Sequence, residues 1–311
     1  MADIKKIATR EAYGEFLVEE GARRPELVVM CADLSGSNKT DGFEKTYPER
    51  FVECGISEQD MFAEAAGIAH SGHVVCASSF AMFAAGRGYE IIRNSIGYTN
   101  ANVKVCATHG GITVGEDGAS HQTVEDLALM RVIPGMLVIN PADAVSTKAL
   151  LGQAFAVDGP VYARLGRSGV PVIYDENDTF EIGKAKTVCE GSDVTIIATG
   201  IMVDAAMQAA EALAAEGISA RVLDMHTIKP IDEEAIIKAA KETGKIVTAE
   251  EHSVIGGLGS AVAEVLVQNY PAPVAMVGQK DCFGESGKPA DLLKKYGMTT
   301  DDIVAAVKGL L

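Results

Sequence analysis

The sequence contains no tryptophan, few aromatic residues and few positive charges. Aromatic residues make up 5% of its 311 residues, and 27 Lys and Arg face 43 Asp and Glu, for a net charge of −16. A surface of this sign repels phosphate backbones, which argues against a nucleic-acid partner. No apolar run approaches the roughly 18 residues of a membrane-spanning helix, and the first residues form no basic, apolar leader. We therefore expect a soluble, cytoplasmic protein with no membrane partner.

Cysteine-based metal sites are also not expected. The six cysteines are widely spaced, and none forms a Cys-x-x-Cys pair. Zinc sites built from cysteine normally use such pairs, so no metal ligands are predicted in this chain. Several of the cysteines lie in short apolar segments, which is typical of buried, reduced thiols in a cytoplasmic protein.

Short apolar segments that suit buried strands alternate with helical patterns along the chain. Examples are the strand-like residues 27–31 and 103–107 and the helix-like residues 8–21. This order is typical of a parallel sheet covered by helices on both faces. A polar, irregular stretch separates two such units. We therefore predict an α/β protein with two doubly wound domains, each a mainly parallel sheet flanked by helices, over residues 1–186 and 187–311.

Five loops that carry candidate site residues follow strand-like segments. They cover residues 32–38, 55–58, 78–83, 108–122 and 164–167. Parallel sheets bind ligands at the carboxyl ends of their strands. We therefore expect these loops to converge on one edge of the first sheet and to form the binding site there.

Glu58 and two phenylalanines are the first candidates for this site. Glu58 lies between an apolar strand and an apolar helix, where its carboxyl is shielded from water and can share a proton with a ring nitrogen. The alternative is a helix N-terminal glutamate stabilised by the helix dipole. Phe80 and Phe83 can present aromatic faces to a planar heterocycle, or simply pack in the core at spacing i and i+3.

Residues 108–122 form a glycine-rich stretch that carries His109, Glu116, Asp117 and His121. Glycine lets the backbone approach a ligand closely. Imidazoles can donate to developing oxyanions or move protons. The acids are too few and wrongly spaced for a calcium loop. An ordinary polar loop or a His-Asp-His metal site are the alternatives.

Two arginines, Arg164 and Arg167, follow a strand-like segment. A guanidinium at a strand end can bind a phosphate or carboxylate through two hydrogen bonds, or form a surface salt bridge. Ser37 and Asn38 are turn-forming residues in the first of the five loops.

Taken together, these segments resemble the pyrimidine-binding and C-terminal domains of the transketolase family, essentially from end to end. The segments that carry the resemblance are Ala32-Asp33-Leu34, Ser37-Asn38, Gly55-Ile56-Ser57-Glu58-Gln59, Ser79-Phe80-Ala81-Met82-Phe83, Thr108-His109, Gly115-Glu116-Asp117-Gly118, His121-Gln122, Thr227-Ile228-Lys229-Pro230 and Glu250-Glu251-His252. The resemblance implies transfer of a two-carbon ketol unit from a ketose phosphate to an aldose phosphate, with thiamine diphosphate and Mg²⁺ as cofactors.

The resemblance also implies which residues face the cofactor. Glu58 matches the glutamate that hydrogen-bonds the aminopyrimidine ring and promotes its imino form, and is a candidate catalytic residue. Phe80 and Phe83 match the aromatic wall around that ring. Asp33 matches a residue near the cofactor site between subunits.

A second set of residues is implied to face the substrate. His109, Asp117 and His121 match groups that contact the sugar hydroxyls and carbonyl, and the two histidines are further catalytic candidates. Arg164 and Ser37 match positions that hold the sugar phosphate.

The chain lacks one part of the family pattern. The diphosphate and metal site of the family is carried by Gly-Asp-Gly followed by an asparagine, and Gly-Asp-Gly does not occur here. A cation that bridges a diphosphate needs carboxylate and carbonyl oxygens in fixed geometry. We therefore predict that a separate partner subunit supplies that domain, that two copies of each chain assemble, that the isolated chain self-associates into a dimer, and that it is inactive alone.

Departures from the family pattern leave three alternatives. Ser57 and Gln59 look more like variants found in split enzymes and in deoxyxylulose-phosphate synthases, and Gly110-Gly111 stands where many full-length transketolases have Asp-Ser. The alternatives are a synthase-like subunit, a subunit like the β chain of 2-oxoacid dehydrogenases, and a cofactor-free homologue that retains only the fold.

Overall fold

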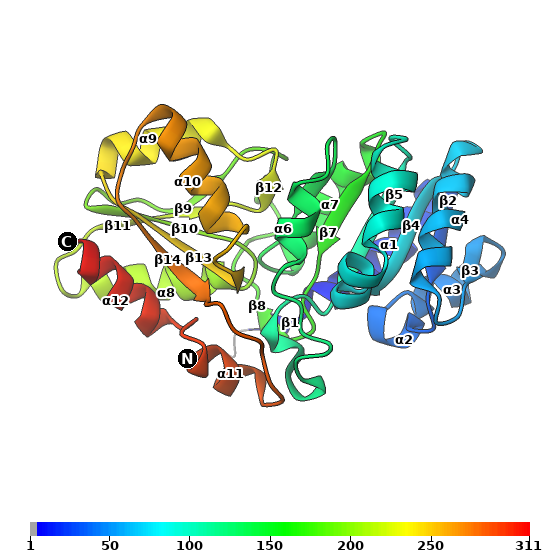
Figure 1. The fold of residues 1–311 in the computed structure, drawn as a ribbon, viewed down its shortest axis with the longest axis horizontal. Coiled ribbons are helices and arrows are strands. Elements are labelled where there is room, and N and C mark those ends of the chain that lie inside the picture. The colour runs from blue at the N-terminus through cyan, green and yellow to red at the C-terminus, as the bar shows by residue number, and fades with distance from the viewer. Residues whose placement is uncertain (1–4) are drawn as a thin grey trace.

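The computed structural model describes residues 5–311. Its strands form a seven-stranded sheet, a five-stranded sheet and a two-stranded ribbon, and helices cover both faces of the two larger sheets (Figure 1). The predicted fold class is confirmed. Residues 1–4 lie outside the described residues, and so does that part of the expectation that the first residues form no leader. Within residues 5–311, no helix is both long enough and apolar enough to cross a membrane.

The seven-stranded sheet has the order β12-β6-β7-β5-β4-β2-β3. Its strands are β2 (Leu27–Cys31), β3 (Phe51–Glu53), β4 (Val74–Phe80), β5 (Val103–Thr108), β6 (Leu137–Ile139), β7 (Val161–Arg164) and β12 (Thr227–Lys229). All neighbouring pairs are parallel except β12 and β6. The continuous apolar character of the central strands agrees with a parallel sheet that is buried on both faces.

Helices on both faces of this sheet supply its core. They are α1 (Thr9–Arg23), α2 (Ser35–Asn38), α3 (Asp41–Thr46), α4 (Glu58–His70), α5 (Tyr89–Ile91), α6 (Asp126–Arg131) and α7 (Ala144–Ala156), with the π-helical segments η2 (Met82–Arg87) and η3 (Ile92–Gly97) and the 3-10 turns η1 (Pro48–Arg50) and η4 (Ile112–Asp117). Phe16 of α1 and Phe155 of α7 pack edge to face at 5.1 Å on one side of the sheet. Phe62 of α4 and Ile96 of η3 are fully buried on the other side.

The five-stranded sheet has the order β14-β13-β10-β11-β9, and only β9 is antiparallel to its neighbour. Its strands are β9 (Lys186–Cys189), β10 (Val194–Ala198), β11 (Ala220–Asp224), β13 (Ile246–Ser253) and β14 (Val274–Gln279), and its helices are α8 (Met202–Ala214), α9 (Glu233–Thr243), α10 (Leu258–Asn269), α11 (Pro289–Lys295) and α12 (Thr300–Leu310). α8 and α12 cover one face, and α9 and α10 cover the other (Figure 1).

One strand joins the two units. β12 follows β11 of the second unit in the chain, yet it pairs with β6 of the first sheet, and Asn140 N–H donates to the His226 carbonyl at 2.8 Å beside it. Three residues give too short a pattern for prediction from the sequence. The ribbon of β1 (Lys6–Ile7) and β8 (Val170–Pro171) was not predicted either. The domain boundary near residue 186 stays a prediction.

Candidate active site

The carboxyl ends of five neighbouring parallel strands meet at one edge of the first sheet. The order β7-β5-β4-β2-β3 places the loops after these strands side by side. The Thr108 hydroxyl donates to Asn38 Oδ1 at 2.6 Å, which ties the loop after β5 to the loop after β2. The Ser79 hydroxyl donates to Glu58 Oε1 at 3.3 Å, which ties the end of β4 to the start of α4. The predicted convergence of these loops is therefore present.

Glu58 is the first residue of α4, and its side chain is 1% exposed. The sequence placed it in a loop, but the helix begins three residues earlier than the predicted start at residue 61. One carboxylate oxygen accepts from Ser79, and the other accepts from Arg87 Nη1 at 2.6 Å. The Arg87 side chain is 47% exposed. A buried carboxylate whose one charged partner can move into solvent is able to exchange that partner for a ring nitrogen of a ligand.

Aromatic rings form a row beside Glu58. The Phe80 and Phe83 rings are nearly parallel, with centroids 6.0 Å apart. His109 stacks on Phe80 at 3.7 Å, and His121 meets Phe83 edge-on at 5.3 Å. The guanidinium of Arg87 lies over the Phe83 ring at 4.8 Å from its centroid. A planar heterocycle fits against this face of Phe83 once Arg87 moves away, because offset stacking on an aromatic ring needs about that separation.

A π-helical segment sets this arrangement. Gly88 N–H donates to the Phe83 carbonyl, five residues earlier, so η2 is wider than an α-helix. π-Helical segments are rare and are frequent at functional sites. The sequence predicts a helix only from about residue 86, so it misses η2, which places Phe83 and Arg87 on the side that faces Glu58.

His109 is held as a neutral imidazole in one tautomer. The Thr108 hydroxyl proton goes to Asn38, so Thr108 Oγ1 accepts from His109 Nδ1 at 2.8 Å. The ring proton is therefore on Nδ1, and Nε2 is an acceptor that lies 3.4 Å from Arg10 Nη1. Burial, helped by Arg10, Arg167 and His121, lowers the pKa of His109 to about 3. A ligand hydroxyl can donate to His109 Nε2 if it replaces Arg10, because the unprotonated ring nitrogen has one lone pair.

The glycine-rich loop after β5, here called the substrate loop, spans residues 108–122. Gly115 adopts a φ of 85° and packs against Pro289, so a Cβ there would approach the proline ring to 3.2 Å. Gln122 is buried, and its Nε2 donates to the Glu285 carbonyl at 2.9 Å. The loop is therefore supported from below by the segment that leads into α11.

Asp117 and His121 lie on the open side of the substrate loop. Asp117 is exposed, and its Oδ2 lies 4.0 Å from Arg167 Nη1. His121 is partly exposed, with Nδ1 3.0 Å from the Ser120 hydroxyl. His121 therefore lies beside the aromatic row, which it contacts through Phe83, whereas Asp117 lies beside Arg167 at the rim.

The residues expected to bind the sugar phosphate have different surroundings. The Ser37 carbonyl accepts from Arg10 Nη1 at 2.7 Å, which brings Ser37 beside His109. Arg164 is 3% exposed; its Nε donates to Asp126 at 2.9 Å and its Nη2 donates to the Glu251 carbonyl at 2.9 Å. Of all the predicted contacts, the one between Arg164 and a sugar phosphate has the least support, because these bonds direct the guanidinium into the protein.

Asp33 lies at the rim of the site. It is exposed, has a φ of 55°, and its N–H donates to Glu53 Oε1 at 2.7 Å. The same carboxylate oxygen accepts from Gly55 N–H at 2.8 Å. Glu53 thus fixes the loops after β2 and β3 side by side, and it leaves the Asp33 side chain directed outward, where a second subunit can reach it.

Sequence reasoning missed two arginines of the site and did not select a third. Arg10 contacts Ser37 and His109, and Arg87 contacts Glu58. Their partners are distant in the sequence, and no local pattern marks them. Arg167 was considered beside Arg164 but not selected; it donates to the Val114 carbonyl and to Glu116 Oε2 at the rim of the site. The signal for Arg167 was its place in one of the five loops.

The described residues offer no evident metal site. Within residues 5–311, no group of three or more His, Cys, Asp or Glu side chains is arranged to hold a metal ion. The residues at this edge of the sheet suit the planar ring of a cofactor and a polyhydroxylated substrate. They are a buried carboxylate, an aromatic row, a neutral imidazole acceptor and guanidinium groups.

Comparisons with known proteins agree with the two units of the fold. Residues 5–172 match the family model described as "Transketolase, pyrimidine binding domain", and residues 183–303 match "Transketolase, C-terminal domain". The chain belongs to the transketolase family.

Three individual matches cover nearly the whole chain. It is 52% identical to a "Putative transketolase C-terminal section" of Methanocaldococcus jannaschii, over 96% of this chain and 94% of that protein. It is 44% identical to a "6-deoxy-6-sulfo-D-fructose transketolase subunit" of a Clostridium species, over 96% and 92%. A solved structure described as "Split gene transketolase, inactive beta4 tetramer" is 57% identical, with a TM-score of 0.92 and 98% of both chains covered.

Proposed function

We propose that this chain is the C-terminal-section subunit of a thiamine diphosphate-dependent transketolase, which transfers a two-carbon ketol unit from a ketose phosphate to an aldose phosphate. The observation that carries the proposal is the convergence of Glu58, the row of Phe80 and Phe83, and the neutral His109 at one edge of the sheet. The similarity to transketolase C-terminal sections supports this reading over a synthase-like or dehydrogenase-like subunit.

The residues beside Glu58 fit the pyrimidine end of the cofactor. When bound, thiamine diphosphate would supply a nucleophilic carbanion and a positively charged ring that accepts electrons. Glu58 would hold the aminopyrimidine ring through the oxygen that accepts from Arg87 in this structure. Phe83 would offer its face to that ring if Arg87 moved into solvent. The fixed positions of Glu58 and Phe83 orient the ring, and the burial of Glu58 excludes water from the bond.

The substrate loop and two arginines fit the sugar. His109 accepts a sugar hydroxyl at Nε2, and His121 and Asp117 contact further hydroxyl or carbonyl oxygens. Arg10 and Arg167 both lie close enough to His109 to lower its pKa. Two guanidinium groups at one rim favour a terminal anion on the substrate, since arginine binds tetrahedral oxyanions through paired hydrogen bonds. A phosphate and a sulfonate both meet this requirement.

A partner subunit supplies the remaining half of the site in this proposal. It carries Gly-Asp-Gly and the later asparagine, holds the diphosphate and Mg²⁺, and joins this chain as two copies of each. The names of the related C-terminal section and of the inactive beta4 tetramer support a split enzyme whose subunit self-associates and lacks activity alone. We also propose domains at 1–186 and 187–311, and a cytoplasmic location, which the six free cysteines support.

Reconstitution tests the proposed function. The purified chain is mixed with a polypeptide that contains Gly-Asp-Gly, with thiamine diphosphate and Mg²⁺, and with xylulose 5-phosphate and ribose 5-phosphate. Turnover is expected in the mixture and not with either chain alone. A parallel assay with 6-deoxy-6-sulfofructose as donor distinguishes a phosphate from a sulfonate at the arginine rim. Appreciable turnover by this chain alone would disprove the split site.

Glu58→Gln is expected to abolish turnover of the reconstituted complex while assembly is retained. The amide keeps the size of the side chain but cannot exchange a proton with the aminopyrimidine ring. Sedimentation of the complex checks assembly, and the coupled ketol-transfer assay checks turnover. Glu64→Gln, an exposed position on the same helix, serves as control and is expected to behave as the unmodified chain. Near-normal turnover of Glu58→Gln would show that Glu58 is not the activating acid.

A further inference from the structure

The second sheet has a crevice of the kind at which doubly wound sheets bind ligands. β10 is the first of its parallel strands, and the chain then adds β11 on one side of it and β13 on the other. The carboxyl ends of β10 and β13 therefore flank the topological switch point, where such sheets hold their ligands. Here the first unit fills the crevice. A Cβ on Gly200 would lie 2.6 Å from Asn140 Nδ2, and the cavity left beside Gly110 and Arg164 is only about 10 Å³.

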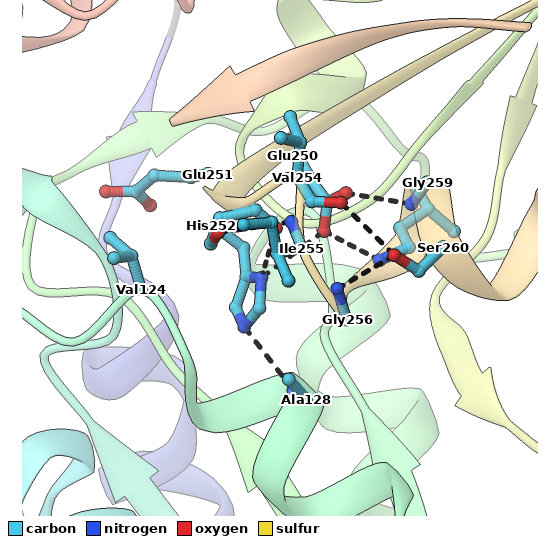
Figure 2. Close-up of polar contacts among 12 residues, drawn as sticks. Val124, Ala128, Glu250, Glu251, His252, Val254, Ile255, Gly256, Gly259 and Ser260 are labelled. Carbon is cyan, nitrogen blue, oxygen red and sulfur yellow. Dashed lines mark hydrogen bonds and ion pairs between the residues drawn. The ribbon is translucent and has the colours of Figure 1, made fainter. Parts of the chain in front are cut away.

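Consecutive side chains at the end of β13 serve different units. Figure 2 shows Glu250 and Glu251 directed away from each other, as expected for neighbours in a strand. The Glu250 carboxylate accepts from Leu258 and Gly259 N–H at 2.7 and 2.8 Å, at the start of α10. The Glu251 carboxylate accepts from Thr113 N–H in the first unit at 2.7 Å. Glu250 therefore stabilises its own unit, whereas Glu251 contacts the substrate loop.

The two residues after Glu251 are bonded to the first unit as well. Figure 2 shows His252 directed toward Ala128, whose N–H donates to Nε2 at 3.4 Å. His252 Nδ1 therefore carries the ring proton and donates to the Ser253 carbonyl at 2.7 Å. Ser253 N–H donates to the Val124 carbonyl at 2.7 Å. Three consecutive residues of β13 thus contact the first unit: Glu251 anchors the substrate loop, and His252 and Ser253 anchor the segment that follows it.

The contact between Glu251 and the substrate loop is closely packed. Glu251 is 3% exposed. A Cβ on Gly111 would lie 2.2 Å from the Glu251 carboxyl carbon, and Gly111 has a φ of 90°, a backbone conformation that favours glycine. Arg164 donates to the Glu251 carbonyl at 2.9 Å. Burial raises the pKa of the Glu251 carboxyl, and the nearby Arg164 charge offsets part of this effect. The loop therefore cannot keep its path at Gly111 if the carboxylate moves toward it.

We propose that Glu251 is a positioning residue, which fixes the substrate loop through its hydrogen bond with Thr113 N–H. The loop lies at the crevice of the second sheet, where other sheets of this kind bind a ligand. Thr113 lies between His109 and His121 in the sequence, so its anchor sets the path of the chain between the two imidazoles. Glu251 itself contacts neither the cofactor nor the sugar. The effect on turnover rests on the proposed function, whereas the effect on loop rigidity does not.

Hydrogen–deuterium exchange of the full chain tests the proposal without a partner. Glu251→Ala is expected to raise the amide exchange rates of residues 114–122 by about tenfold, as the loss of one buried hydrogen bond implies. This range leaves out the Thr113 amide, which loses its own acceptor in the variant. β5 and β10 are expected to keep their rates. Glu251→Gln retains an acceptor oxygen and is expected to restore most of the protection. Unchanged exchange at 114–122 in Glu251→Ala, or an equal rise in β5, β10 and the loop, would overturn the proposal.

Glu250→Ala is the matched control. Glu250 is also a buried carboxylate on β13 that accepts backbone N–H groups, but those groups belong to α10. Its replacement is expected to raise exchange at the start of α10 and to leave residues 114–122 unchanged. A rise at 114–122 as large as that in Glu251→Ala would mean that any buried acid on β13 affects the loop through stability alone, which contradicts a positioning role for Glu251.

Kinetics of the reconstituted complex separate this inference from the proposed function. Glu251→Ala is expected to lower kcat/KM for the sugar phosphates by about tenfold, because misplaced contacts weaken transition-state binding. The affinity for thiamine diphosphate should stay unchanged, since Glu58 and Phe83 lie on other loops, and Glu251→Gln should recover most of the loss. An unchanged kcat/KM in Glu251→Ala contradicts the positioning role. If no mixture shows turnover, the proposed function fails, and the exchange experiment alone decides the role of Glu251.

Discussion

At the scale of single residues, His109 shows how neighbouring groups set a protonation state. Its Nδ1 proton is committed to Thr108, and its pKa is lowered to about 3, first by burial and then by the positive charge of Arg10 and Arg167. The imidazole therefore acts as a hydrogen-bond acceptor at neutral pH and does not become a cation under ordinary conditions. A neutral acceptor beside two guanidinium groups gives the site separate places for a hydroxyl and for an anion.

This protonation state has a consequence for stability. Unfolding exposes His109, which then takes up a proton near its ordinary pKa of 6.5, whereas the folded chain stays neutral to about pH 3. Between these values the unfolded state binds the extra proton, so the free energy of unfolding falls as pH falls, by about 1.4 kcal/mol per pH unit for this group. His109→Gln is expected to lose this contribution, which urea unfolding at several pH values between about 4 and 6.5 measures.

The exposed His73 provides the control for this measurement. His73→Gln is expected to keep the pH slope of the unmodified chain, because the replacement leaves the surroundings of His109 unchanged. If His109→Gln also keeps the full slope, then His109 is not the neutral, buried group described above.

Residue-scale prediction selected residues where the polar groups are concentrated in one segment. Glu58 and His109 lie in dense local patterns, and the structure has both at the carboxyl edge of the first sheet, while their roles stay predictions. Arg10 and Arg87 were not identified, because each acquires its role from a partner at least 27 residues away in the chain. Choosing between Arg164 and Arg167 required knowing which guanidinium is consumed by internal bonds, and sequence spacing does not contain that information.

At the scale of secondary-structure elements, η2 controls access to Glu58. Its π-helical geometry places the Arg87 guanidinium over Phe83 and against the Glu58 carboxylate. In the proposed complex the pyrimidine ring would take both of these positions. Cofactor binding would then break the ion pair, in which the Arg87 side chain is half-exposed.

Arg87→Gln is expected to tighten the binding of thiamine diphosphate to the reconstituted complex by up to about fivefold, since an ion pair worth up to about 1 kcal/mol no longer has to be broken. Calorimetric titration measures the affinity. Arg93→Gln, on the exposed side of η3, is the control and is expected to leave the affinity unchanged. Weaker binding in Arg87→Gln would show instead that the guanidinium itself contacts the cofactor.

Elements with strong patterns were predicted well, and short ones were not. The strand at residues 27–31 was predicted with the bounds that it has in the structure, because five apolar residues between turn signals have few other interpretations. β12 has three residues, and its pairing with β6 depends on how the two units dock. The sequence predicted one helix from about residue 86 to residue 97, which covers η3 but misses most of η2, because periodicity does not separate π-helical from α-helical hydrogen bonding.

At the scale of the whole molecule, the two units share a hydrophobic core. One cluster of buried side chains includes Val105 and Tyr162 from the first unit and Ile197, Leu223 and Ile246 from the second. A boundary in sequence is therefore not a boundary in packing. Hydrophobic runs along the chain predict two sheets, but they do not show that the two sheets bury one face together.

The shared core predicts one cooperative unfolding transition in scanning calorimetry. Ile228 of β12 is 2% exposed and belongs to this cluster. Ile228→Ala is expected to lower the free energy of unfolding by about 2–4 kcal/mol and to keep a single transition, because the substitution leaves a buried cavity. Val267→Ala, an exposed position on α10, serves as control. Two separate transitions, of which Ile228→Ala shifts only one, would contradict a shared core.

The pairing of β12 with β6 has a further consequence for attempts to divide the chain. β6 would otherwise be an edge strand of the first sheet, with a row of unpaired backbone groups. Such edges bind the strands of other molecules and promote aggregation, and natural proteins normally cover them. β12 provides this cover from the second unit. A fragment that ends before residue 227 would thus leave β6 open to self-association, so poor solubility of such fragments would reflect an uncovered strand and not a failure of the first sheet to fold.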